Sequence, residues 1–287
     1  MTTHHRMIAI DGVNIFYRES GAADAPAVLL LHGFPTSSHM YRNLIPALSD
    51  RFHVIAPDLP GFGFSEAPDR SSFTYSFDRL AGIIERFTEQ LGLARFAVMV
   101  FDYGAPIGFR LAVNHPERIS AIISQNGNAY LEGLSDGFNP IQAYWQNRSE
   151  ANRNALRGFL AAGTTKWQYV TGAHDESVIA PEAYTLDQAL LDRPGNDEIQ
   201  LDLFSDYERN VALYPAIQAY FRAHRPKLLA VWGRNDPFFL PPGAEAFRRD
   251  LPDAEIHLLD AGHFALESRG PEIASLINDF LNRTLTA

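Results

Sequence analysis

The sequence contains no cysteine, which excludes disulfides, thiolate metal ligands and cysteine nucleophiles and suits a cytoplasmic protein. It also lacks any apolar run approaching the ~18 residues of a membrane-spanning helix, and its first residues have no apolar stretch typical of a signal peptide. Basic residues are in deficit, because 24 Lys and Arg face 34 Asp and Glu and leave a formal net charge of −10. Nucleic acid and anionic membranes repel such a protein, so we expect neither as a partner.

What the sequence does contain is a regular alternation of apolar strands with helical patterns. Two short runs, 7–10 and 13–17, flank the turn signal Asp11-Gly12 and predict an antiparallel hairpin. Further apolar runs, each typical of a buried strand, lie at 27–31, 53–57, 96–101, 119–124, 227–232 and 255–259. Helical patterns separate most of these runs, which predicts an α/β fold with a mostly parallel central sheet flanked by helices.

The alternation lapses between residues 128 and 223. This interval contains helical patterns, for instance at 140–145 and 150–162, and no convincing buried strand. A structureless loop of that length is uncommon in a compact domain, so we predict an inserted helical cap, or lid. The predicted core is then residues 1–127 and 224–287, with the cap at residues 128–223.

The run that ends at Phe101 is followed by a carboxylate and then by a helix. Asp102 ends the predicted strand, and a helical pattern begins at Gly104 and runs to about Asn114. The small residues Gly104 and Ala105 give the side chain of Asp102 the close backbone clearance that a nucleophile elbow requires. Such an elbow usually carries Ser, whereas this one presents Asp.

Two further reactive groups follow predicted strands. Asp236 comes shortly after the run at 227–232, and His263 comes shortly after the run at 255–259. Because the carboxyl ends of parallel strands meet at one edge of a sheet, we expect both to lie near Asp102. Taken alone, each is an ordinary turn or loop residue, but together they have the order nucleophile, acid, histidine of a catalytic triad.

These residues resemble the α/β-hydrolase superfamily, and within it the epoxide hydrolases and haloalkane dehalogenases that use aspartate as nucleophile. His32-Gly33-Phe34-Pro35 is similar to the His-Gly-x-Pro of those epoxide hydrolases, and the stretch 61–65 to their Gly-x-small-x-Ser. The resemblance implies Asp102 as nucleophile, His263 as general base and Asp236 as orienting acid. Some relatives place the acid after the preceding strand, but the loop at 125–128 offers no carboxylate here.

An aspartate nucleophile suits displacement at a saturated carbon, which leaves an alkyl ester on the enzyme. Water activated by His263 would then hydrolyse that ester, with the tetrahedral oxyanion bound by backbone N–H groups. The resemblance assigns these oxyanion donors to Phe34 and Tyr103. It implies no cofactor, and we expect no metal because the histidines show no ligand spacing.

The resemblance also implies two proton-donating tyrosines from the cap. Tyr207 is the first, because the stretch 206–210 is similar to a Tyr-Arg-Asn stretch late in epoxide-hydrolase caps, and Tyr144 is our choice for the second over Tyr130, Tyr169 and Tyr184. We expect four residues at the substrate pocket: His32, Pro35, Trp145 and Trp167. In a chain with 11 Tyr and 20 Phe, the alternative is that such aromatic residues simply pack.

Three functions are compatible with these motifs. The leading one is epoxide hydrolysis, which converts a small apolar epoxide and water to a diol. The second is haloalkane dehalogenation, although similar dehalogenases usually have Trp where this chain has Tyr103 and often Asn where it has Phe34. The third is another α/β hydrolase or a non-catalytic small-molecule receptor. A homodimer is left open.

Overall fold

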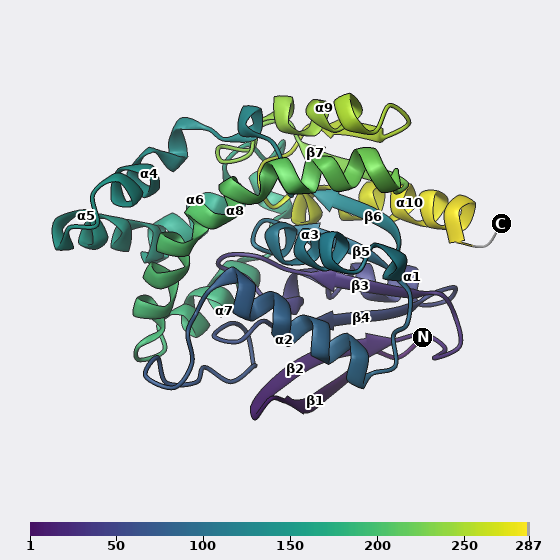
Figure 1. Ribbon diagram of the computed structural model, residues 1–287, viewed down its shortest axis with the longest axis horizontal. Helices are drawn as coiled ribbons and strands as arrows, with labels where there is room; N and C mark the ends of the chain where they lie inside the picture. Colours follow the sequence, from purple (N-terminus) through teal and green to yellow (C-terminus); the bar gives the residue numbers. More distant parts are fainter. Residues whose placement is uncertain (286–287) are drawn as a thin grey trace.

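The computed structural model describes residues 1–285 and contains one eight-stranded sheet in the order β1-β2-β4-β3-β5-β6-β7-β8 (Figure 1). The strands are β1 (His4–Ile10), β2 (Val13–Ser20), β3 (Ala27–Leu31), β4 (His53–Pro57), β5 (Phe96–Phe101), β6 (Ile119–Gln125), β7 (Leu228–Gly233) and β8 (Glu255–Leu259). β2 pairs antiparallel with β1 and β4, and all other neighbours are parallel. The predicted α/β fold with a mostly parallel sheet is confirmed.

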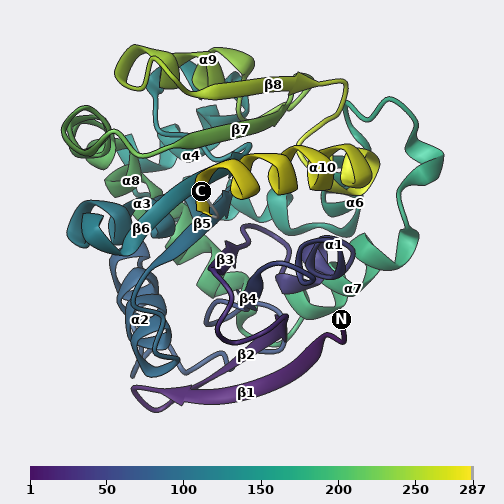
Figure 2. The same ribbon diagram turned by 90° about the vertical axis from the view of Figure 1, so that its right-hand side faces the viewer.

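Helices cover both faces of this sheet, as the turned view in Figure 2 shows. One face carries α2 (Phe77–Gln90), α3 (Gly104–Asn114), α8 (Asn196–His224) and α9 (Pro241–Asp250), and the other carries α1 (Leu44–Leu48) and α10 (Ala265–Leu285). Alternate residues of each strand serve the two faces: in β5, Val98 and Val100 point to the first and Ala97 and Met99 to the second. Burial on both faces explains why this strand is apolar throughout.

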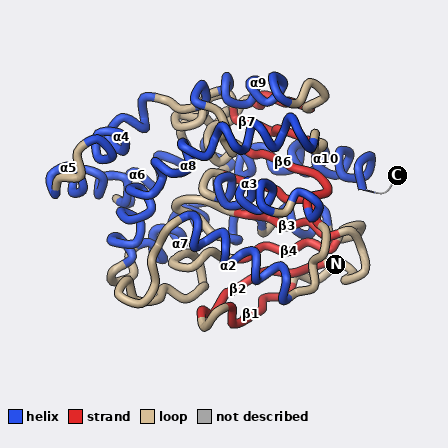
Figure 3. Tube along the Cα trace, in the orientation of Figure 1, coloured by secondary structure: helices blue, strands red, loops and turns tan. Residues whose placement is uncertain are grey.

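Between β6 and β7 the described chain forms helices and contributes no strand to the sheet. We call residues 128–223 the helical segment, and we keep its role as a cap as a proposal. Its main helices are α4 (Asn139–Gln146), α5 (Glu150–Ala155), α6 (Ala162–Val170), α7 (Pro181–Leu191) and α8. Figure 3 shows α4, α5 and α6 to the left of the strands. In residues 1–285, no helix is both long and apolar enough to cross a membrane.

The predicted helix at 150–162 is wrong in its extent. α5 ends at Ala155, a 3-10 turn follows over Leu156–Leu160, and α6 begins only at Ala162. Ala161 between them has an extended backbone, with φ −74° and ψ 143°. The glycines at 158 and 163 have low helix propensity, which explains why one helix does not continue through this stretch.

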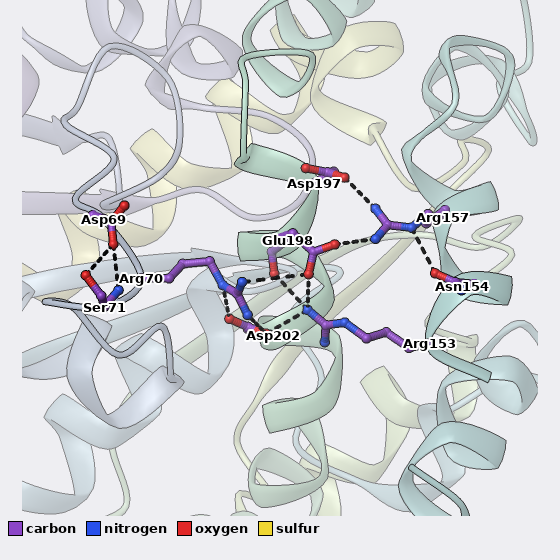
Figure 4. A network of polar contacts seen from close by, with 9 residues as sticks. All are labelled: Asp69, Arg70, Ser71, Arg153, Asn154, Arg157, Asp197, Glu198 and Asp202. Atoms are coloured by element: carbon purple, nitrogen blue, oxygen red, sulfur yellow. Dashed lines mark hydrogen bonds and ion pairs between the residues drawn. The ribbon is translucent and has the colours of Figure 1, made fainter. Parts of the chain in front are cut away.

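Ion pairs join the helical segment to a loop of the core, and Figure 4 shows them from close by. Arg70, in the loop between β4 and α2, donates from Nε to Oδ2 of Asp202 on α8 at 2.7 Å. Arg153 on α5 donates to both Asp202 and Glu198, and Arg157 also donates to Glu198. We call these five residues the arginine–carboxylate network.

Candidate active site

Asp102 occupies a tight corner between β5 and α3. Its backbone has φ 46°, in the left-handed region that Asp tolerates better than most residues. A Cβ on Gly104 would lie 2.1 Å from the carbonyl oxygen of Leu31, and a Cβ on Gly33 would lie 2.3 Å from Oδ1 of Asp102. Glycine at both positions therefore lets β3, its loop and α3 close around the carboxylate, as the predicted elbow requires.

Two backbone N–H groups point at this carboxylate. The N–H of Phe34 donates to Oδ1 of Asp102 at 2.6 Å, and the N–H of Tyr103 also hydrogen-bonds to Asp102. These are the donors that the resemblance assigned to the oxyanion hole. In this structure they hold the carboxylate of Asp102 itself, which fixes its orientation.

His263 lies between the two carboxylates of the predicted triad. Its Nδ1 is 2.8 Å from Oδ2 of Asp236, and its Nε2 is 4.0 Å from Oδ2 of Asp102. The first distance is a hydrogen bond, and the second exceeds one. Asp236 therefore fixes the ring, while Nε2 faces Asp102 without a direct hydrogen bond to it.

Asp236 is itself held by a residue that the motifs did not reveal. Nδ2 of Asn126 donates to Oδ2 of Asp236 at 2.6 Å, and the N–H of Phe238 donates to Oδ1 at 2.7 Å. Oδ1 of Asn126 accepts from the N–H of Gly233 at 3.0 Å. Asn126 lies in the loop at 125–128 that lacks a carboxylate. Its φ is 50°, a conformation in which Asn is enriched, so an Asn directly after a strand was the one available signal.

Burial and neighbouring charges shift both titrating members of this group. Burial raises the pKa of Asp102 from 3.8 to about 6, against the lowering effects of His263 and the two backbone N–H groups. Burial alone lowers the pKa of His263, but the charge and hydrogen bond of Asp236 and the charge of Asp102 outweigh it and leave that pKa raised. A buried carboxylate and a histidine whose pKa values are both shifted in this way are typical of a catalytic site.

A largely apolar cavity opens at Asp102. Its unfilled space, counted together with the open solvent at its mouth, is about 390 Å³. Its walls come from the core and from the helical segment. The lining residues are Phe34, Asp102, Tyr103, Phe138, Ile141, Phe159, Gln168, Phe204, Tyr207, Phe238 and His263. In residues 1–285, no group of three or more His, Asp or Glu side chains is arranged to hold a metal.

The structure places only the first of the two predicted tyrosines at this cavity. Tyr207, on α8, is buried and contacts the ring of Tyr103 at a centroid distance of 5.9 Å. Tyr144 is outside the described cavity lining: the Arg148 guanidinium lies 5.8 Å from its ring, and its side chain hydrogen-bonds Arg153. The hydroxyl of Tyr144 is engaged by Arg153, so the geometry does not bring it to Asp102.

None of the four predicted pocket residues is in the described lining. His32 is buried, with Nδ1 3.0 Å from the carbonyl of Gly33 and Nε2 accepting from the N–H of Leu59 at 3.0 Å. Burial lowers its pKa, so the ring stays neutral, and its two hydrogen bonds hold the loop that carries Phe34. Pro35 is buried in the same loop.

The two tryptophans lie behind or beside the cavity wall. Nε1 of Trp145 donates to the carbonyl of Phe204 at 2.9 Å, and its ring is parallel to that of Tyr207 at 6.3 Å. Trp167 is 43% exposed and meets Phe238 edge-on at 5.8 Å. Both support residues that line the cavity. The lining residue Phe204 was not predicted. Its position one helical turn before Tyr207 on α8 was the signal that could have identified it.

Comparison with known proteins agrees with this geometry. The family described as alpha/beta hydrolase fold matches residues 26–269, so the chain belongs to that family. The uncharacterized hydrolase YNR064C of Saccharomyces cerevisiae is 46% identical over 277 residues, which cover 95% of each chain. A haloalkane dehalogenase of Psychrobacter cryohalolentis is 28% identical over 282 residues, or 94% of this chain and 88% of its own.

A solved structure shows the same likeness at the level of the fold. The epoxide hydrolase CorEH superposes with a TM-score of 0.80 at 19% identity and covers 98% of this chain and 99% of its own. Relatives and structural neighbours thus include both kinds of enzyme that the motifs resemble, and the predicted α/β-hydrolase resemblance is confirmed.

Proposed function

We propose that this hydrolase forms an alkyl ester on Asp102 and that its substrate is a small apolar epoxide, which it converts to a diol. The observation that carries the proposal is the cavity itself, because Tyr207 and Asp102 both line it. A displaced epoxide oxygen needs a proton, and a buried phenol can supply it. We also propose that the helical segment acts as the cap over this cavity.

In the first step, Asp102 attacks a ring carbon of the epoxide. The new carbon–oxygen bond forms the ester, the ring carbon–oxygen bond breaks, and its electron pair goes to the epoxide oxygen. The hydroxyl of Tyr207 then gives its proton to that oxygen. Burial, with the neighbouring Tyr214 and Asp102, raises the pKa of Tyr207 and keeps it protonated until then.

In the second step, His263 removes a proton from water, which attacks the ester carbonyl. The N–H groups of Phe34 and Tyr103 bind the oxyanion, and its collapse releases the diol and the Asp102 carboxylate. The proton held by His263 restores the Tyr207 phenol. Ester formation removes the Asp102 charge, one of the charges that raise the pKa of His263. Alkylation thus favours the neutral ring just before a general base is needed.

Haloalkane dehalogenation is the second candidate. The dehalogenase relative favours it, and so does the buried hydroxyl of Tyr103, which lines the cavity and has no hydrogen-bond partner within the described chain. A halide needs hydrogen-bond donors and no proton, so donors of this kind suffice. The same nucleophile, base and oxyanion hole would serve.

The test is a single turnover in water labelled with oxygen-18, using terminal and aryl epoxides beside 1-haloalkanes. Label in the peptide that holds Asp102, together with diol, supports the epoxide proposal. Label there together with halide release assigns the second function. Turnover with no label in Asp102 would refute the ester mechanism. In parallel, His263→Gln should still be alkylated and accumulate an ester, seen as a gain in intact mass.

A further inference from the structure

Gln168 lines the cavity, and its side-chain amide nitrogen is unpaired within the described chain. It lies on α6, is 1% exposed and lines the same space as Asp102 and Tyr207. Its Nε2 has no hydrogen-bond partner within residues 1–285. A buried donor without a partner destabilises the folded state, because it has lost its hydrogen bonds to water, and such groups are uncommon in folded proteins. An unpaired Nε2 that lines a cavity therefore points to a ligand atom that accepts its hydrogen bond.

The neighbours of Gln168 on α6 hold it firmly. Trp167 meets Phe238 edge-on, and the ring of Tyr169 stacks on Phe264 at a centroid distance of 3.8 Å and an interplanar angle of 11°. Phe264 directly follows the catalytic histidine in the chain, and Phe238 lines the cavity. α6 is therefore anchored on both sides of Gln168, so the amide is positioned before any substrate arrives.

We propose that the side-chain amide of Gln168 is the second hydrogen-bond donor to the departing epoxide oxygen, in the role that the sequence predicted for Tyr144. The inference rests on the proposed alkylation of Asp102. As the ring carbon–oxygen bond breaks, negative charge develops on the oxygen, and the two lone pairs of that oxygen accept from Tyr207 and Gln168 together. An amide N–H does not release its proton, so the proton comes from Tyr207 while Gln168 stabilises the charge.

This donor also selects among substrates. An epoxide oxygen satisfies the Nε2 of Gln168, whereas an apolar molecule of the same shape leaves it buried and unpaired. A site built to hydrogen-bond a polar atom discriminates strongly against analogues that lack that atom. The amide therefore favours a substrate with a compact acceptor next to the carbon that Asp102 attacks.

Gln200 provides a matched control. It is a second fully buried glutamine of the helical segment, on α8, and neither of its amide atoms has a partner in the part of the chain that the structure describes. It is not among the described residues that line the cavity. Replacing Gln200 by Met removes the same buried amide and leaves the cavity unchanged.

The experiment measures alkylation alone, in a His263→Gln background that holds the ester. Intact mass follows the rate of adduct formation on Asp102 with an aryl epoxide. We expect added Gln168→Met to slow alkylation roughly 10²-fold, as removal of an oxyanion donor does, and added Gln200→Met to leave the rate within about twofold. Equal rates in both double variants would overturn the inference. No adduct in the His263→Gln parent would instead overturn the proposed function.

Gln168→Glu in the same background separates donation from packing. A protonated carboxyl donates a hydrogen bond to the leaving oxygen, whereas an ionised one repels the developing charge. The rate of this variant divided by that of the parent at the same pH should therefore rise as pH falls through the titration of the introduced carboxyl. A ratio that does not change with pH would show that Gln168 only fills space, even if Gln168→Met fails to fold.

Discussion

Replacing Asp187 by Asn should stabilise the protein at neutral and alkaline pH. Asp187 lies on α7 and is 1% exposed. The hydroxyl of Tyr169 donates to its Oδ2 and also lies 3.4 Å from Oγ1 of Thr36, in the loop that carries Phe34. The Oδ1 of Asp187 has no partner within residues 1–285. The carboxyl is therefore enclosed at the junction between the helical segment and the loop that carries Phe34.

The magnitude follows from its titration. Burial raises the pKa of Asp187 from 3.8 to about 7, although hydrogen bonds from Tyr169 and Thr36 oppose the shift. The folded state thus holds the proton more tightly than the unfolded chain. The stability that this proton contributes is complete below about pH 4 and is lost as pH rises to about 7. A shift of about three pKa units corresponds to about 4 kcal/mol.

Asn has nearly the same shape as Asp and does not titrate. The free energy of unfolding of Asp187→Asn should therefore not show this fall with rising pH. The free energy of unfolding would come from denaturant titrations followed by tryptophan fluorescence, at intervals from about pH 4 to about pH 8. We expect the variant to gain about 4 kcal/mol relative to the parent across this range, because contributions from other groups cancel in the difference. A difference that stays constant within about 1 kcal/mol would contradict the reasoning.

Further predictions concern the site itself. Tyr207→Phe should slow epoxide opening roughly 10²-fold without lowering the melting temperature, in stopped-flow single turnovers. In Asn126→Gly, the glycine tolerates the positive φ, but Asp236 loses the hydrogen bond from Nδ2 of Asn126. This variant should slow ester hydrolysis roughly tenfold and destabilise the fold by about 2 kcal/mol. The rate of alkylation should fall tenfold per pH unit below about pH 6, since Asp102 attacks only as a carboxylate. Pre-steady-state mass spectrometry would show a flat profile there if the pKa were not raised.

The sheet was predictable because burial on both faces leaves a direct mark on the sequence. The runs at 27–31, 53–57 and 96–101 coincide with the buried strands β3, β4 and β5, and the run at 255–259 with the half-buried edge strand β8. The bounds of the helices in the helical segment were less clear from the sequence. The continuity of α8 over Asn196–His224 was not predicted, because Pro215 interrupts its pattern and its environment changes from cavity wall to core surface along its length.

The triad positions could be predicted because each residue follows a strand, and parallel strands deliver their carboxyl ends to one place. The cavity walls could not. Whether Tyr144 or Gln168 reaches Asp102 depends on how α4 and α6 turn about their axes, which long-range contacts set. Gln168 is an uncharged polar residue within a short helix, and nothing in its sequence neighbourhood distinguishes it.

Beyond the packing of α8 on the sheet, two different kinds of contact attach the helical segment to the core. α6 and α7 are held by the Tyr169–Phe264 stack and the enclosed Asp187, while α5 reaches the core loop through the arginine–carboxylate network. Exposed ion pairs contribute at most about 1 kcal/mol each and weaken with salt. We therefore expect local unfolding to start at α5. Amide hydrogen exchange in α5 should become faster as ionic strength rises, while α6 stays protected. The helical segment can therefore open locally at α5 while Gln168 keeps its place in the cavity at Asp102.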